Sequence, residues 1–275
     1  MKNKLFIYLF IIILFNQNLL FADIFNIESS EIKILEKGNI TEAKKGVKII
    51  SNDGIEINSD ELSYDKKKNI LRVFGNVKIK DKKNNIFTEG EEYVYYKNIE
   101  KIISKGKTNS KIQDEYIIKS LDLIYERNLS KIYSQNKSNI IDQNNNSFSF
   151  SKFEFDIDNN ILKAKDLSLF DSLNNQYYLS FAVVNLKENK FLGSDISIDF
   201  KDDLFGNNDN DPRLKAKSLI SENNETKVFK GSFTTCKQDK DKCPPWAIYA
   251  EEIVHEKKER KIEYKNAWLK IYDKP

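Results

Sequence analysis

The sequence NDGIEINSDELSYDKKKNILRVFG, residues 52–75, contains a pattern that recurs about every 30 residues through most of the chain. Around Ser59, Ile57 lies two residues before, Leu62 three after and Tyr64 five after. We call each such position of the repeat a slot. Similar residues occupy the same slots around Gly90, Ser120, Phe150, Ser180, Ala216 and Ala250. Such a repeat predicts a fold built by stacking copies of one unit.

Apolar residues alternate on both sides of Ser59, but the parity of the alternation changes across it. Ile55 and Ile57 are an odd number of positions from Leu62 and Tyr64. Alternation predicts a strand with one buried face, and the change of parity predicts a bulge or sharp bend that keeps both halves facing one interior. We therefore expect an all-β jellyroll of antiparallel strands. The competing fold is a β-solenoid, in which strand parity should stay constant.

A second slot, sixteen residues after the first, holds small or turn-forming residues. They are Gly75, Gly106, Asn136, Asp166 and Asn266. Glycine, asparagine and aspartate favour turns, so we expect a turn to close each unit at this slot.

Residues 1–22 have the features of a secretory signal peptide: two lysines, an apolar run over Leu5–Phe15 and a small residue at the end. An uncleaved anchor would need about 20 apolar residues in a row. The polar residues Asn16–Asn18 interrupt the run before that length. We expect cleavage after Ala22, export to the periplasm, and a single domain over residues 23–275.

The composition does not point to nucleic acid or to catalysis. Without Lys2 and Lys4 the chain has 43 basic and 42 acidic residues. The single histidine, His255, occupies a slot held by tyrosine in other units. We find no serine elbow, phosphate-binding glycine loop, zinc cluster or dinucleotide motif. The acidic stretch Asp199–Arg213 does not have EF-hand spacing. We expect a solvated loop there, no metal, no cofactor and no enzymatic activity.

The two cysteines, Cys236 and Cys243, are separated by the polar segment KQDKDK. In an oxidising periplasm such residues are normally bridged. They could bond each other, or cysteines on a segment that this chain lacks.

Residues 234–275, TTCKQDKDKCPPWAIYAEEIVHEKKERKIEYKNAWLKIYDKP, resemble the end of the periplasmic domain of the lipopolysaccharide-assembly family LptD. The stretch NDNDPRLKA, residues 208–216, is similar to the loop and strand that precede this segment in the family. The repeats from Gly46 onward resemble the OstA-type β-jellyroll shared by proteins of this pathway.

The resemblance implies a V-shaped jellyroll with an open apolar groove for the acyl chains of lipopolysaccharide. It also implies an LptA-like bridge partner of the same fold, a C-terminal outer-membrane barrel with an LptE-like lipoprotein plug, and a location at the periplasmic face of the outer membrane. The chain stops at Pro275, about where the barrel of the family begins. We expect at least one cysteine to bond the barrel. The alternative is a stand-alone OstA-like bridge protein, against which the segment 236–275 argues.

Two sets of site residues follow. The first should face one interior and form the lipid-binding groove, unless that interior is an ordinary filled core. It comprises Ile57, Leu62, Tyr64, Val73, Tyr93, Tyr95, Ile118, Leu123, Tyr125, Phe153 and Phe155. The second is an N-terminal edge from about Ile32 to Ile50, including Val47 and Ile49, which should pair strand to strand with the bridge partner.

Overall fold

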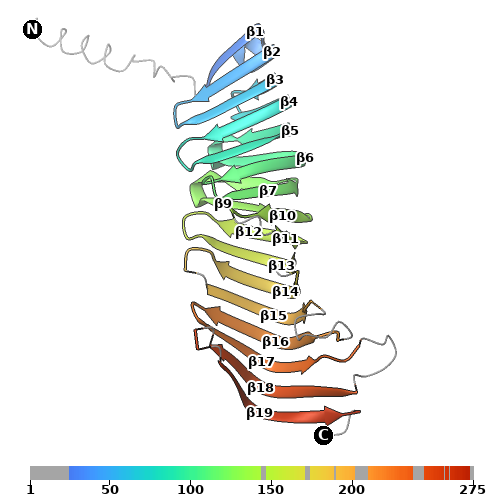
Figure 1. The fold of residues 1–275 in the computed structure, drawn as a ribbon. Coiled ribbons are helices and arrows are strands. Elements are labelled where there is room, and N and C mark those ends of the chain that lie inside the picture. The colour runs from blue at the N-terminus through green and yellow to red at the C-terminus, as the bar shows by residue number, and fades with distance from the viewer. Residues whose placement is uncertain are drawn as a thin grey trace, which may run out of the picture.

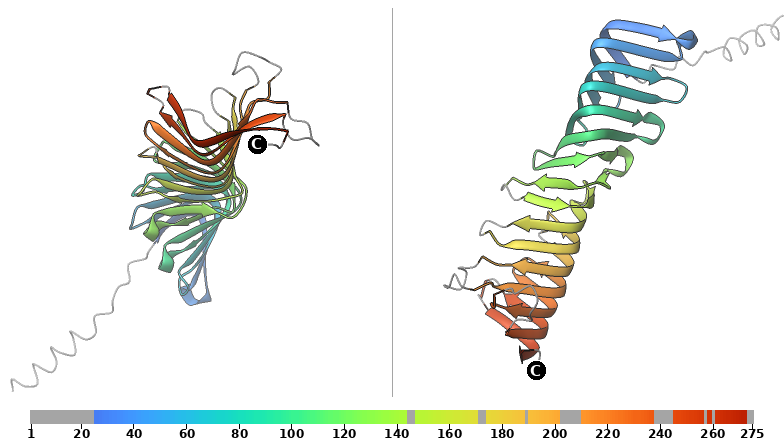
Figure 2. Two further views of the ribbon diagram at one scale, coloured as in Figure 1. Left: turned by 90° about the horizontal axis from the view of Figure 1, so that it is seen from below. Right: turned by 90° about the vertical axis from the view of Figure 1, so that its right-hand side faces the viewer.

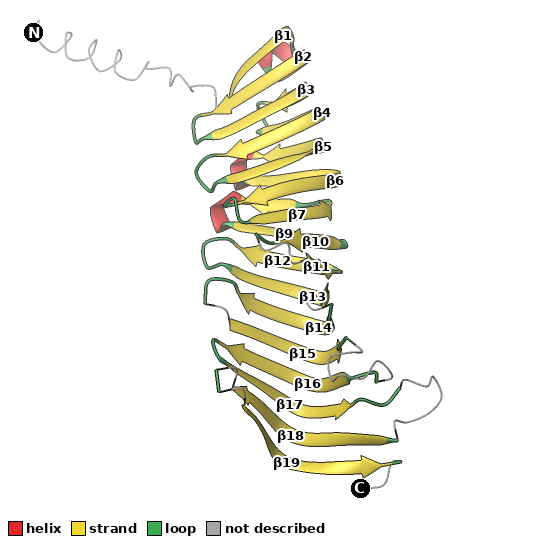
Figure 3. Cartoon of the chain, in the orientation of Figure 1, coloured by secondary structure: helices red, strands yellow, loops and turns green. Residues whose placement is uncertain are grey.

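The computed structural model describes residues 25–143, 147–170, 174–188, 190–201, 210–237, 245–256, 258–259 and 261–272. In these residues nineteen strands and three short 3-10 helices follow one another down an elongated stack (Figures 1 and 3). The strands before the middle are β1 (Phe25–Leu35), β2 (Ile40–Ser51), β3 (Ile55–Asp65), β4 (Ile70–Asp81), β5 (Ile86–Tyr96) and β6 (Lys101–Ile112). The middle strands are β7 (Tyr116–Leu121), β8 (Ile124–Glu126), β9 (Lys131–Ser134), β10 (Ser138–Ile141), β11 (Ser147–Phe150) and β12 (Lys152–Asp156). The last strands are β13 (Ile161–Phe170), β14 (Gln176–Asn185), β15 (Lys190–Asp199), β16 (Arg213–Glu222), β17 (Glu225–Thr234), β18 (Trp246–Glu256) and β19 (Lys261–Ile271). The helices are η1 (Glu36–Gly38), η2 (Lys97–Ile99) and η3 (Arg127–Leu129).

Consecutive strands pair antiparallel from β1 to β6 and from β13 to β19. Between them, three bent strands are each split into two halves. β7, β10 and β11 continue one arm of the sheet, while β8, β9 and β12 continue the other, and both arms rejoin at β13. The expected all-β jellyroll is confirmed, and a parallel solenoid is excluded for the described residues.

Each long strand is bent near its middle, so that the stack has two facing arms when viewed from its end (Figure 2, left). The pairing register shifts between Asn58 and Glu61 in β3, and between Gly90 and Glu92 in β5. These are bulges at the positions where the sequence changes parity. The extra residue of each bulge belongs to the neighbouring strand, β4 or β6, and it turns the paired strands while both halves keep their apolar side chains inside.

The prediction of a turn at the second slot was wrong. Gly75, Gly106, Asp166 and Asn266 lie inside strands and have φ values of +73°, +79°, +52° and +49°. They form the bend of every second strand, and Asn136 lies in the break between β9 and β10. Residues that tolerate left-handed backbone suit bulges as well as turns, so residue type alone did not separate the two. The unit is thus a pair of bent strands.

Candidate functional site

The eleven residues predicted to share one interior all belong to a single buried cluster, and each is at most 4% exposed. They come from the part of the stack between β3 and β12, where the facing arms pack against each other. In this section the interior is filled by side chains. That these residues bind lipid stays a prediction.

The turns form two rows, which we call the first and second edges of the bent sheet; the space between them is the mouth. The first edge contains residues 52–54, 82–85 and 113–115, and the second contains residues 36–39, 66–69, 97–100 and 127–130. Backbone hydrogen bonds link turns within an edge. Lys82 N donates to Gly54 O at 3.2 Å on the first edge, and Arg127 N donates to Glu100 O at 2.9 Å on the second.

Aromatic pairs close the mouth at two levels. Near the start of the stack, the ring of Phe25 meets Tyr64 and Tyr95 edge-on at centroid distances of 5.1 and 5.9 Å. Further along, Tyr116 on the first edge meets Phe155 from the second at 5.8 Å. Edge-to-face aromatic contacts of this kind are favourable beyond the area they bury.

Between these aromatic levels lies a polar cluster that we call the mouth clasp: Asp53, Asp81, Lys97, Tyr125 and Arg127. From the second edge, Arg127 Nη1 donates to Asp53 Oδ2 at 2.6 Å and Arg127 Nε donates to Asp81 Oδ2 at 2.9 Å. Lys97 Nζ reaches Asp53 Oδ2 at 2.6 Å, and Tyr125 Oη donates to Asp81 Oδ2 at 2.7 Å. Every one of these contacts crosses the mouth.

Burial and close contacts in the clasp shift the pKa values of Asp53, Asp81 and Tyr125. The side chains of Arg127 and Asp81 are 6% and 1% exposed. Burial acts to raise the pKa of Asp53 and of Asp81, but hydrogen bonds from the cations and their positive charge outweigh it and lower both pKa values. Burial and the hydrogen bond to Asp81 raise the pKa of Tyr125, which keeps its proton available for donation. The carboxyl groups of Asp53 and Asp81 are therefore ionised at neutral pH.

Beyond the Tyr116–Phe155 pair an apolar cavity of about 370 Å³ opens between the arms, and we call it the groove. Its apolar lining is Tyr116, Ile140, Phe148, Leu162, Leu167, Leu169, Val184, Leu186 and Phe191. The polar residues Glu115, Asp142 and Gln143 complete the lining. Leu162 and Leu167 are buried, whereas Leu169, Val184 and Phe191 are half-buried. The groove thus has the lining expected of a site for an apolar ligand.

The interior becomes more exposed toward the C-terminal end. Val228 and Ile253 on inward faces are both 7% exposed. In β19, Tyr264 pairs with Ile253 and Leu269 pairs with Ile248, so both face the interior, yet they are 45% and 49% exposed. At the other end of the stack, the inward-facing Ile34 of β1 is 68% exposed. The inward apolar row is therefore continuous and uncovered at both end strands.

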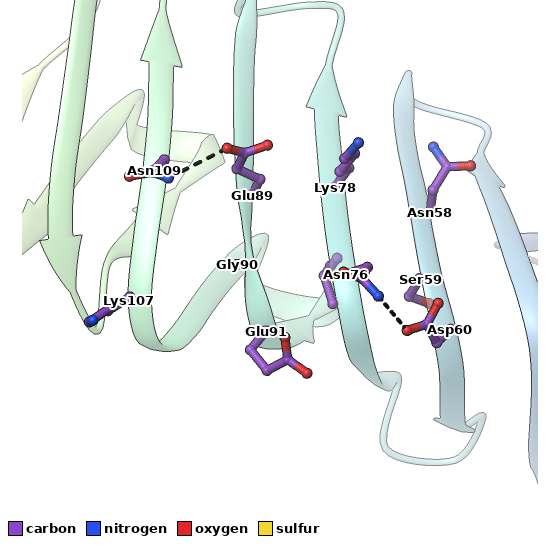
Figure 4. Close-up of a pocket in the computed structure, with 11 residues that line it drawn as sticks. Asn58, Ser59, Asp60, Asn76, Lys78, Glu89, Gly90, Glu91, Lys107 and Asn109 are labelled. Atoms are coloured by element: carbon purple, nitrogen blue, oxygen red, sulfur yellow. Dashed lines mark hydrogen bonds between the residues drawn. The ribbon is translucent and has the colours of Figure 1, made fainter.

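A separate hollow of about 540 Å³ lies on the outer face of the bend, over β3 to β6 (Figure 4). Two pairs of its polar side chains are hydrogen-bonded: Asn76 Nδ2 donates to Asp60 Oδ2 at 2.8 Å, and Asn109 Nδ2 donates to Glu89 Oε1 at 3.4 Å. This hollow is the outer side of the bulges. It shares no lining residue with the groove.

Val47 and Ile49 are not on a free edge, contrary to the prediction. They lie in β2, which pairs with β1 on one side and β3 on the other, and their side chains are 3% and 0% exposed. The edge strand is β1, whose pairing among the described residues is with β2. Pairing of this end with a partner stays a prediction, now placed on β1.

Several predictions fall wholly or partly outside the described residues, namely the signal peptide, Cys243 and residues 202–209 of the acidic loop. Cys236 is described and half-buried, and its thiol lies 3.8 Å from the carbonyl oxygen of Trp246. Within the described ranges, His, Cys, Asp and Glu side chains do not gather in threes at a spacing suited to a metal ion. No helix in that part of the chain is long and apolar enough to cross a membrane.

Sequence reasoning missed the mouth clasp, and none of the eleven residues predicted for a lipid-binding groove lines the groove observed here. Arg127 is one of only four arginines in a lysine-rich chain. That was an available signal, because a planar guanidinium suits a buried site with several carboxylates better than an ammonium does. The groove residues Leu169 and Phe191 belong to the looser copies of the repeat, where the pattern was weakest.

Comparisons with known proteins agree with the repeat. Residues 12–135 match the family model described as OstA-like protein. A search of curated proteins found no match. Among solved structures, LptH of Pseudomonas aeruginosa, described as the LptA-homologous periplasmic component of a lipopolysaccharide transport device, is similar at 12% identity. The similarity covers 51% of this chain and 81% of LptH, with a TM-score of 0.24. The family match covers less than half of the chain, and among the described residues it spans β1 to β9.

Proposed function

We propose that this protein is a periplasmic carrier of lipopolysaccharide, which holds the acyl chains of the lipid in its apolar interior and passes them along the stack. In this proposal the protein is not an enzyme. One observation carries it: the inward apolar row runs the length of the sheet, opens into the groove beyond Tyr116 and Phe155, and is uncovered at both ends. The OstA-like match over residues 12–135 supports the same role.

The chemistry of the groove suits acyl chains. Its floor is formed by Leu162 and Leu167, and Val184 and Phe191 line its side, so a hydrocarbon chain would exchange water for apolar contact along its length. Such burial is worth about 25 cal/mol per Å² of apolar surface. Glu115 and Asp142 lie among the lining residues, and polar groups there would keep a charged headgroup outside.

Photo-crosslinking in cells tests this role with matched neighbours. We expect p-benzoylphenylalanine at Phe191 or Leu169, which face the groove, to capture lipopolysaccharide. The adjacent residues Leu192 and Phe170 point outward and are 48% and 55% exposed, so they are apolar controls on the same strands. Equal capture from inward and outward positions would contradict the proposal.

Within this role, we propose that the chain is the periplasmic domain of an LptD-type protein, delivering lipid to an outer-membrane barrel with an LptE-like plug. The resemblance of residues 234–275 supports it. A stand-alone bridge between LptA-like partners is the second candidate, since the OstA-like match fits either. Non-reducing peptide mapping of the native protein separates them: a bond from Cys236 or Cys243 to a barrel peptide supports the first, and a bond only between these two cysteines supports the second.

A further inference from the structure

The mouth over β2 to β9 is closed by side chains alone. Among the described residues, the backbone hydrogen bonds between turns run along each edge, such as Gln113 N to Asn85 O at 2.9 Å and Lys97 N to Asn69 O at 3.0 Å. The contacts from edge to edge in this section are the Phe25 ring contacts and the side chains of the mouth clasp, with Asn84 Nδ2 donating to Tyr125 Oη at 2.6 Å. The edges could therefore part without breaking the strand ladders.

The bends provide a place for such a movement to be absorbed. Gly46 and Gly106 lie at bends of β2 and β6, with φ values of +82° and +79°, and a methyl group added at either would meet nothing within 4 Å. Small backbone rotations at these open positions would swing one arm away from the other. Hinges are commonly a few residues that absorb such changes.

The chemistry of the clasp differs from that of a permanent wall. Buried ion pairs usually contribute less to stability than apolar residues of similar size. The neighbouring closure by Tyr116 and Phe155 uses such apolar residues. Two clasp members, Asp53 and Lys97, lie at turns, where their side chains remain 36% and 15% exposed. When the edges part, these charges regain water at once.

We propose that the mouth clasp is a gate that controls whether acyl chains reach the interior of the N-terminal section. With the clasp closed, chains occupy the groove and the C-terminal strands. With it open, they extend to Leu71, Tyr95 and Ile102, which are otherwise 0%, 1% and 2% exposed. This inference rests on the proposed carrier function and adds its regulation.

The test uses purified mature protein, lipid A with a diazirine at the end of one acyl chain, and mass-spectrometric mapping of the labelled peptides. Wild-type protein should be labelled mainly around Phe148, Leu169 and Phe191. The double variant Asp81→Asn/Arg127→Gln removes both buried charges together, and labelling of peptides containing Leu71 or Ile102 should rise about tenfold.

The matched control is Lys101→Gln/Glu126→Gln. These residues form an ion pair of 2.9 Å between the paired strands β6 and β8, next to Arg127, but their contact does not cross the mouth. This variant should keep the wild-type labelling pattern. An equal rise in both variants would show that general loosening, and not the clasp, admits the lipid.

A covalent lock keeps the test decisive if the open variant does not fold. In a background with Cys236→Ser and Cys243→Ser, Asp53→Cys and Lys97→Cys are joined by a short bis-maleimide. Locking should abolish the residual labelling around Leu71 and leave groove labelling unchanged. Wild-type labelling that is as strong at Leu71 as at Phe191, or insensitive to both the variant and the lock, would overturn the gate. Absence of labelling everywhere would instead overturn the carrier function on which the gate depends.

Discussion

Arg127 Nη1 and Asp53 Oδ2 are 2.6 Å apart, although the two residues are separated by 74 positions in the chain and lie on opposite edges of the bent sheet. Arg127 also contacts Asp81 and Glu100, so one guanidinium joins three carboxylates from three different turns. A planar group with five donors is suited to this arrangement. The contact joins the two edges of the closed N-terminal section, and the groove begins further along the stack, beyond Tyr116 and Phe155.

The first prediction concerns the stability that this contact provides. Arg127→Met should lower the free energy of unfolding by about 3 kcal/mol, because it leaves the carboxylate of Asp81 buried without its cation. Lys101→Met removes the more exposed ion pair with Glu126 and should cost less than about 1 kcal/mol. Urea denaturation followed by circular dichroism measures both. Similar losses in the two variants would mean that the burial of Arg127 is energetically unimportant.

The pH dependence of stability should reflect Asp53 and Asp81, whose pKa values in the folded state lie below the ordinary 3.8. The unfolded state binds their protons more readily than the folded state, so the stability they provide is complete above about pH 5. It should be lost as the pH falls below about 4, toward the folded pKa values. Arg127 stays cationic and Tyr95 and Tyr125 stay neutral throughout this range, because the pKa values of all three are raised.

Urea midpoints at pH 7, 5 and 3 measure this effect. The wild-type midpoint should change little from pH 7 to 5 and fall at pH 3. In the variant Asp53→Asn/Asp81→Asn, the midpoint should fall less between pH 5 and pH 3. If the midpoint of the variant fell at pH 3 as far as that of the wild type, the loss of stability would be due to other carboxylates.

The bends can be tested with two glycines that share a backbone conformation. Gly75→Ala places a methyl group 2.5 Å from Asp60 Oδ2, whereas Gly106→Ala meets nothing within 4 Å, and both have φ near +75°. Both should pay about 1 kcal/mol for the left-handed backbone, and Gly75→Ala should cost more because Asp60 must move. The difference between their melting temperatures checks this. If the two variants lowered the melting temperature equally, Asp60 would accommodate the added methyl group without a loss of stability.

Partner pairing, if it uses the N-terminal end, should depend on β1. A proline scan over residues 31–35 should alternate, because successive N–H groups of an edge strand point toward β2 and away from it. Prolines at positions pointing toward β2 should destabilise the strand, and those pointing away should weaken binding of an LptA-like partner while stability is retained. Alanine at the same positions is the control. Uniform effects along the strand would favour contacts through side chains.

The sequence allowed the bent strand to be predicted, because the parity change at Ser59 follows directly from side-chain alternation. It did not separate a bulge from a turn at Gly75, since both need a residue that tolerates positive φ. The contact of Arg127 with Asp53 could not be predicted from the sequence. It depends on the angle between the two arms, which brings together residues that are 74 positions apart in the chain. The groove at Leu169 and Phe191 depends on the same angle between the arms.

The most direct test of the carrier function is a comparison of the affinity of the purified protein for intact and for fully deacylated lipopolysaccharide, measured by isothermal titration calorimetry. The acyl chains should provide the binding energy, so deacylation should weaken binding by at least about a hundredfold, with a negative heat-capacity change for the intact lipid. Phe191→Asp in the groove should weaken binding of the intact lipid, while Leu192→Asp on the outer face should not. Equal affinity for the intact and deacylated forms would contradict the assignment of the apolar interior as the lipid site.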